Sequence, residues 1–252
     1  ECVYPTFQYI HDLRHNQQLA LEEMLDADAR GYANFLWMLV GQGKTLTVLR
    51  FLEQTRKCRY IVWAVPKSGI ASIARQIKEV GWKPLMLYPS PGLLNKSRAF
   101  NESNGFEATR NTTLRPDCVT LIEHDHLYKM VDSLAKQMCN TAFVFDEVHK
   151  AMQSQTKRTA SSLRLARISK QLIALTGTPI VDRSGYGLME WLRLCVPFPV
   201  ATSNFWVAAN SMVSKLNTGN VFVEEREEQA PEDSMVTFSS VNPGSGSVEQ
   251  IT

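Results

Sequence analysis

The stretch Asn34-Phe-Leu-Trp-Met-Leu-Val-Gly-Gln-Gly-Lys-Thr45 joins an apolar run to a glycine-rich turn and the start of a helical pattern. The run from Asn34 to Val40 predicts a buried strand. Gly41-Gln-Gly-Lys-Thr45 follows it and opens a helix, a setting in which backbone N–H groups curl around phosphate oxygens. The stretch therefore predicts a phosphate-binding loop, in which Lys44 reaches the β- and γ-phosphates and Thr45 ligates magnesium.

Apolar runs and helical patterns alternate on both sides of this loop. The strands expected to be buried on both faces are residues 34–40, 60–65, 85–88, 118–122, 141–145 and 171–175. The expected helices are residues 16–30, 44–54, 69–80, 126–138, 159–169 and 187–195. Because strands and helices alternate, the sequence predicts right-handed crossovers and a parallel sheet covered on both faces. The fold class is α/β.

Two segments depart from this pattern. Residues 89–117 are rich in Asn, Ser, Gly, Thr and Arg, and are expected to form a surface insertion without regular structure. Residues 207–252 turn acidic and then Ser- and Gly-rich, and are expected to form a tail or linker toward an absent second lobe. Residues 1–206 are thus the expected folded lobe. Its apolar runs are shorter than the roughly 20 residues needed to cross a bilayer, so no membrane span is expected.

The charge and the cysteine content limit which binding partners and which cellular compartment are expected. Of the 27 basic and 25 acidic residues, two bases and seven acids lie from Met212 onward, which leaves residues 1–211 with an excess of seven bases. This excess is compatible with a polyanion such as nucleic acid, or with a merely solvated basic surface. The five cysteines are widely spaced and include no CxxC pair, which favours a reducing intracellular compartment such as the nucleus, the cytoplasm or a viral particle.

A carboxylate pair follows another expected strand. Asp146-Glu147 comes directly after residues 141–145, at the end of the strand where ligands bind in open α/β sheets. Asp146 is expected to hold magnesium, and Glu147 to orient and polarise the water that attacks the γ-phosphate of ATP. An acidic pair at the start of a helix explains the same residues when they are taken alone.

Leu175-Thr-Gly-Thr-Pro-Ile180 ends the last expected strand. The hydroxyls of Thr176 and Thr178 can hydrogen-bond His149 and Glu147, which would couple the nucleotide site to a neighbouring surface. Lys44 and Asp146 are 102 residues apart, and Asp146 and Thr176 are 30 apart, so whole crossover units fit between them. All three motifs are therefore expected at the carboxyl edge of one sheet.

With these motifs the chain resembles the superfamily 2 helicases, and among them the Swi/Snf-type DNA translocases. Gly41–Thr45 resembles motif I, Asp146-Glu-Val-His149 the DExH form of motif II, and Thr176–Ile180 motif III. The resemblance implies a RecA-like lobe that binds ATP and Mg²⁺. The residues it assigns to ATP are Gln17 as the adenine reader, from Leu13-Arg-His-Asn-Gln17, with Gly41, Gln42, Gly43, Lys44 and Thr45.

The resemblance also implies a nucleic-acid surface, with DNA favoured over RNA. Ala64-Val-Pro-Lys-Ser68 resembles motif Ia and Leu121-Ile-Glu-His-Asp125 motif Ib, so the expected contacts are Lys67, Ser68 and His124. Members of the family carry a second RecA-like lobe with arginine fingers, and nothing after residue 206 resembles it. A non-catalytic scaffold derived from a helicase and a ring-forming ATPase remain as alternatives. Trp37, Trp63 and Trp82 are expected to be packing residues.

Overall fold

The computed structural model describes residues 12–152, 156–177 and 186–195, together with three short strands nearer the C-terminus. The chain divides into two units, Glu1–Pro179 with Gly187–Phe198 and Ile180–Tyr186 with Pro199–Thr252. Among the residues described, no helix has the length and apolar character required to span a membrane.

A seven-stranded sheet organises the first unit, and every pairing in it is parallel. Its strand order is β1-β7-β6-β2-β5-β3-β4. The strands are β1 (Asn34–Trp37), β2 (Tyr60–Val65), β3 (Lys83–Leu87), β4 (Glu107–Thr109), β5 (Cys118–Glu123), β6 (Thr141–Phe145) and β7 (Gln171–Thr176). The prediction of a parallel α/β fold is confirmed. Strands distant in sequence are neighbours, with Trp37 of β1 opposite Thr176 of β7.

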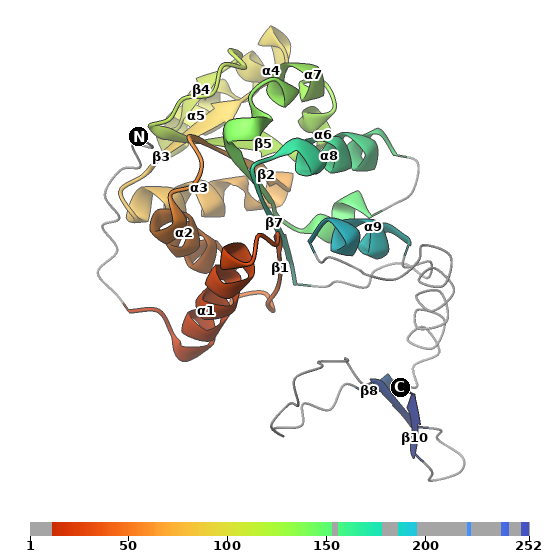
Figure 1. The fold of residues 1–252 in the computed structure, drawn as a ribbon. Coiled ribbons are helices and arrows are strands. Elements are labelled where there is room, and N and C mark those ends of the chain that lie inside the picture. Colours follow the sequence, from red (N-terminus) through yellow and green to blue (C-terminus); the bar gives the residue numbers. More distant parts are fainter. Residues whose placement is uncertain are drawn as a thin grey trace. The chain divides into compact units, whose positions relative to one another are not determined.

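Helices cover both faces of this sheet (Figure 1). One face packs against α1 (His15–Ala29), α2 (Lys44–Thr55) and α3 (Ile70–Glu79). The other packs against α6 (His124–Leu127), α7 (Val131–Ala135), α8 (Lys157–Ile168) and α9 (Tyr186–Cys195). The arrangement follows from strands that are apolar on both sides, because neither face of such a sheet can remain in water.

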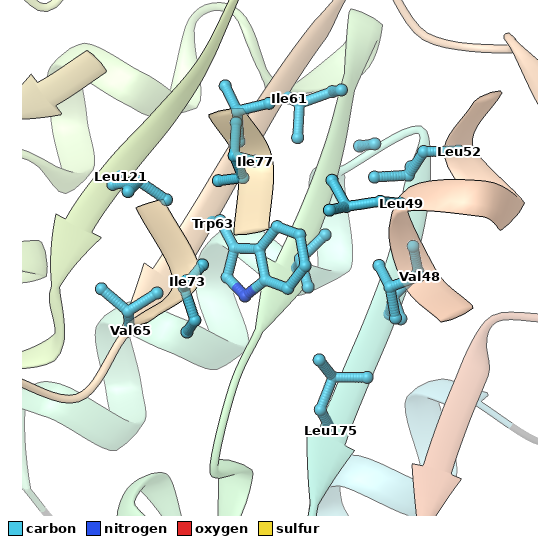
Figure 2. Close-up of a cluster of buried hydrophobic side chains, with 14 of the residues drawn as sticks. Val48, Leu49, Leu52, Ile61, Trp63, Val65, Ile73, Ile77, Leu121 and Leu175 are labelled. Carbon is cyan, nitrogen blue, oxygen red and sulfur yellow. The ribbon is translucent and has the colours of Figure 1, made fainter. Parts of the chain in front are cut away.

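The central strand β2 shows how the two cores are built. Trp63 is fully buried and lies among Ile73 and Ile77 of α3 and Leu49 of α2 (Figure 2). The adjacent Val62 is equally buried but belongs to the opposite core cluster, because successive side chains of a strand alternate between faces.

The three tryptophans predicted to be packing residues differ in their burial. Trp63 and Trp82 are buried, as expected of packing residues. Trp37 is 59% exposed, so its assignment to packing is wrong. The reason is the strand order, since β1 is the edge strand of the sheet and its last residue has only one neighbouring strand.

The prediction of no regular structure in residues 89–117 is also wrong. The segment contains α4 (Pro91–Lys96), α5 (Arg98–Asn104) and β4, which adds a parallel edge strand next to β3. Ser90 caps α4 by accepting a hydrogen bond from the N–H of Leu93, and Pro91 occupies the first turn, a start signal that the polar composition obscured. The Tyr88 hydroxyl bonds the buried Asn101 side chain at 3.1 Å and anchors α5.

The helix expected over residues 126–138 is interrupted. It is replaced by α6, α7 and a 3₁₀ turn, η2 (Met138–Asn140). The N–H groups of Lys129 and Met130 bond the carbonyls three residues earlier, so the chain tightens between α6 and α7. Leu127, Leu134 and Met138 remain buried, which explains why the apolar pattern resembled one helix.

The second unit contains a three-stranded antiparallel sheet in the order β10-β9-β8. Its strands are β8 (Val221–Phe222), β9 (Phe238–Val241) and β10 (Val248–Ile251). These strands lie in the segment predicted to be a tail or linker, and the remainder of that segment lies outside the described residues.

Candidate functional site

Four neighbouring strands, β1, β7, β6 and β2, bring their carboxyl ends together around one cavity. The cavity has a volume of about 360 Å³. It is lined by Val40, Pro66, Ser68, Gly69, Asp146, Glu147, His149, Lys150 and Gly177. The expected convergence of the three motifs is therefore present.

The phosphate loop has the expected backbone. Gly41 and Gly43 have φ angles of +84° and +86°, a left-handed conformation that side chains disfavour, and Gly43 precedes the first residue of α2. The Lys44 ammonium donates a 2.8 Å hydrogen bond to the Met38 carbonyl across the loop. Gln42 accepts a 2.9 Å bond from the N–H of Leu39. The loop is thus closed on itself by its own side chains.

Gln17 supports this loop from α1. Its side-chain oxygen accepts a 2.9 Å bond from the N–H of Arg14, and its amide nitrogen donates to the Gly43 carbonyl at 3.2 Å. A Cβ at Gly43 would lie 2.2 Å from that nitrogen and would displace it, and the φ of +86° strains any residue other than glycine at this position. Gln17 lies next to the phosphate loop, and its role in reading adenine stays a prediction.

Asp146 leaves β6 in a fixed position. Its N–H bonds the Ala64 carbonyl of β2 at 2.9 Å, and its carboxylate accepts a 3.0 Å bond from the N–H of Glu147. Burial and the neighbouring Glu147 carboxylate raise the pKa of Asp146 to about 6, while Lys44 opposes the rise. A cation near this carboxylate would stabilise its ionised form.

Glu147 connects motif II to motif III. Its backbone is left-handed, with φ at 49°. Its carboxylate lies 3.2 Å from His149 Nδ1 and accepts a 3.4 Å bond from the N–H of Gly177. His149 Nδ1 also lies 3.2 Å from the Thr176 hydroxyl, so the expected contact between these two residues is confirmed. Burial lowers the pKa of His149, and the Glu147 carboxylate opposes that shift. Thr178 lies outside the described residues.

Gly177 is where motif III meets the phosphate loop. A Cβ at this position would lie 3.2 Å from Val40 and 3.4 Å from the Lys44 ammonium. The absence of a side chain therefore lets the end of β7 approach the loop closely.

The two residues expected to hold magnesium offer oxygen atoms, the kind of ligand that Mg²⁺ takes. Thr45, half-buried in the first turn of α2, supplies a hydroxyl, and Asp146 a carboxylate. Mg²⁺ is commonly held by one or two protein oxygens together with substrate phosphates and water, so a larger protein cage is not required.

The three residues predicted to contact nucleic acid differ in their exposure to solvent. Lys67 and Ser68 are exposed in η1 (Lys67–Gly69), directly after β2. His124 is wrong as a contact residue, because it is only 3% exposed and stacks on Phe145 with ring centroids 4.4 Å apart. Burial lowers the pKa of His124 to about 3, so its ring is neutral and serves packing.

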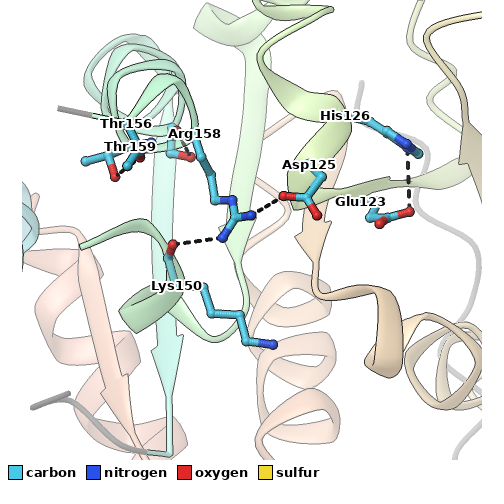
Figure 3. A network of polar contacts seen from close by, with 8 residues as sticks. Glu123, Asp125, His126, Lys150, Thr156, Arg158 and Thr159 are labelled. Carbon is cyan, nitrogen blue, oxygen red and sulfur yellow. Dashed lines mark hydrogen bonds and ion pairs between the residues drawn. The ribbon is translucent and has the colours of Figure 1, made fainter. Parts of the chain in front are cut away.

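A bridge that the motifs did not predict joins motif II to motif Ib. Arg158 of α8 pairs with the Asp125 carboxylate and donates a 3.2 Å bond to the Lys150 carbonyl in η3 (Val148–Ala151) (Figure 3). Lys150 itself lines the cavity. No sequence signal marked Arg158, which lies in the first turn of an ordinary amphipathic helix.

The parallel sheet, the glycine-rich loop after β1 and the Asp-Glu pair after β6 define a RecA-like lobe of a helicase-type ATPase. Residues 10–181 match the family described as type III restriction enzyme, res subunit, and the chain belongs to this family. No curated protein matches the chain.

One solved structure similar to the chain is the Sulfolobus solfataricus SWI2/SNF2 ATPase core in complex with double-stranded DNA. The TM-score is 0.59 at 17% sequence identity, and the match covers 87% of this chain. This chain spans only 42% of the length of that one. The likeness shows the fold.

Proposed function

We propose that the chain is the ATP-binding lobe of a nucleic-acid-dependent ATPase, a helicase or a DNA translocase, that hydrolyses ATP by magnesium-assisted in-line displacement. The observation that carries the proposal is the position of Glu147. Its carboxylate lies at the cavity, held between His149 and Gly177, while the Lys44 ammonium lies against Gly177 from the phosphate loop.

Each residue has a role that follows from its contacts. Lys44 exchanges the Met38 carbonyl for the β- and γ-phosphate oxygens when ATP binds, because a charged acceptor bonds an ammonium more strongly than a carbonyl does. Thr45 and Asp146 would hold Mg²⁺, which when bound would neutralise charge on the phosphates. Glu147 orients the attacking water and polarises it. Gln17 faces the base, while Gly41, Gln42 and Gly43 shape the loop.

His149, Thr176 and Thr178 form the coupling group of the proposal. His149 contacts both Glu147 and Thr176, so a displacement of motif III changes the surroundings of the catalytic carboxylate. The hydroxyl of Thr178 is assigned to the same group from the sequence alone.

Nucleic acid is the proposed activator. Lys67 and Ser68 are exposed beside the cavity at the carboxyl edge of the sheet. The basic excess of residues 1–211 favours a phosphate backbone as partner. DNA is preferred to RNA because a structurally similar ATPase core was solved with double-stranded DNA.

Full activity requires a second RecA-like lobe, supplied by the rest of the native chain or by another subunit. Arginine fingers typically contribute about 10³–10⁵ to the rate of such reactions. The 252-residue chain alone is expected to bind ATP-Mg²⁺ weakly and to turn it over slowly.

The test is the substitution Glu147→Gln, with Glu79→Gln as a matched control on the exposed end of α3. Calorimetric titration with ATP-Mg²⁺ and a turnover assay with and without DNA are run on both variants. The amide keeps the shape of the carboxylate but polarises water poorly, so binding is retained and turnover is lost only in Glu147→Gln. Turnover within about threefold of the unmodified chain would contradict the role. Nucleotide binding without turnover, even when the second lobe is supplied, would favour a non-catalytic module.

A further inference from the structure

Four exposed lysines lie near α6. Among the residues the structure describes, none of Lys67, Lys129, Lys150 and Lys157 forms an ion pair with a carboxylate. Of the nearby carboxylates, Asp125 pairs with Arg158, and Glu123 lies 3.7 Å from His126, whose pKa is lowered by burial. Figure 3 shows both pairs, with the Lys150 side chain extending away from them. Among the described residues, the four lysines outnumber the one nearby carboxylate without an arginine partner, Glu123, so the region has an excess of positive charge.

Tyr128 brings two of these lysines together. Its ring is 38% exposed, directly after α6. The Lys129 ammonium lies 5.5 Å from the ring centroid, and the Lys157 ammonium lies 6.0 Å from it. Both distances are within the range of cation–π attraction. The two lysines come from different elements, a loop and the start of α8, so the ring is the common point that holds them near each other.

The position of this group relates it to the candidate ATP site. Since α6 follows β5 at once, Tyr128 lies toward the carboxyl edge of the same sheet. Arg158, adjacent to Lys157, bonds the carbonyl of Lys150, and Lys150 lines the cavity. Lys157 is thus connected to a residue of the cavity, Lys150, through its neighbour Arg158.

We propose that Tyr128, Lys129 and Lys157 form a clamp for the phosphate backbone of a nucleic-acid strand, in which Tyr128 positions the two ammonium groups. The inference rests on the proposed function and adds a contact outside the helicase motifs. Two ammonium groups beside one ring can contact backbone phosphates without reading base sequence. Because the cations lie against the ring, we assign Tyr128 to positioning and not to stacking on a base.

The experiment measures fluorescence anisotropy of labelled oligonucleotides of mixed sequence, in duplex and single-stranded form, over a range of salt concentrations. Lys129→Ala and Lys157→Ala should each weaken binding for every sequence and reduce the salt slope by about one. Tyr128→Ala should weaken binding about two- to fivefold, the effect of losing an exposed cation–π contact. Tyr128→Phe should bind like the unmodified chain, because the ring is retained.

Matched control residues lie near the amino ends of the strands, whereas the candidate site lies at their carboxyl ends. Lys170 is exposed just before β7, and Tyr32 is 41% exposed before β1. Lys170→Ala and Tyr32→Ala should leave affinity and salt slope unchanged. Thermal unfolding of every variant confirms that the fold is retained.

The outcomes separate the clamp from the proposed function. If the unmodified chain binds no oligonucleotide, the nucleic-acid part of the proposed function and the clamp both fail. If it binds and the lysine variants behave like Lys170→Ala, only the clamp fails. Loss of binding in Tyr128→Phe equal to that in Tyr128→Ala would overturn the positioning role and assign the contact to the hydroxyl.

Discussion

The Gly43 carbonyl accepts a hydrogen bond from the Gln17 side-chain amide at 3.2 Å, so the first helix is attached directly to the phosphate loop. Gln17 is 4% exposed, and its other amide atom accepts from the backbone of Arg14. The residue that the resemblance assigns to adenine therefore also fixes the shape of the glycine-rich loop.

Gln17→Ala should consequently affect stability as well as nucleotide binding. The substitution removes two part-buried hydrogen bonds, with the N–H of Arg14 and with the Gly43 carbonyl, each worth about 0.5–1.5 kcal/mol. Thermal unfolding without nucleotide measures this loss. A residue that only contacts the base would leave the unfolding temperature of the free chain unchanged, and that result would sink the structural role.

Lys44→Ala should remove most ATP affinity. The loss of a charge-assisted contact with the phosphates is worth about 1.5–3 kcal/mol, or roughly a ten- to hundredfold weakening. Calorimetric titration provides the measurement, with Lys83→Ala, an exposed residue at the amino end of β3, as control. Equal affinities of the two variants would refute the phosphate-loop assignment.

Thr176→Val should impair the positioning of the Glu147 carboxylate while leaving nucleotide binding nearly unchanged. The substitution keeps the side-chain volume of this fully buried residue but removes the hydroxyl that contacts His149. Since His149 also contacts the Glu147 carboxylate, we expect a lower kcat with little change in KM. Turnover by the chain joined to its second lobe, compared with the unmodified protein, checks this. A change confined to KM would contradict the coupling.

The raised pKa of Asp146 predicts a pH dependence of stability in the absence of metal. Its pKa is about 6 in the folded chain against an ordinary value of 3.8, so the folded state binds more protons between these values. The free energy of unfolding should therefore fall as pH rises from about 4 to about 6, by up to about 2–3 kcal/mol.

Asp146→Asn is the control for this effect, because the amide cannot titrate. Denaturant unfolding of both proteins at a series of pH values gives the free energy of unfolding as a function of pH. The two curves should differ in slope between about pH 4 and about pH 6. Parallel curves would show that Asp146 titrates normally.

The sheet and the three nucleotide motifs were predictable because their signals are local. A strand buried on both faces is a continuous apolar run, as in Tyr60–Val65, and a phosphate loop is a short glycine pattern between strand and helix. The strand order and the edge position of β1 depend on pairing between distant segments, so the exposure of Trp37 was missed.

The errors near the nucleic-acid surface have the same origin. His124 stands in a motif-like segment, but its burial is decided by the ring of Phe145, which is 21 residues away. The Arg158 bridge likewise joins residues 33 apart in sequence, Arg158 and Asp125. The short helices of residues 91–104 bury few apolar side chains, so they have no strong periodic pattern.

The order of the strands also sets how far apart the motifs stand. The segments that follow β1, β7, β6, β2 and β5 are motifs I, III, II, Ia and Ib, in adjacent positions along one edge. At about 4.8 Å per strand, motif I lies roughly 19 Å from motif Ib, more than twice the screening length of about 8 Å in physiological salt. Charge at one end of this row is therefore only weakly felt at the other through solvent. In the proposed function, a signal between the phosphate loop and motif Ib would therefore pass through contacts between neighbouring strands, with motifs III, II and Ia as the intermediate steps.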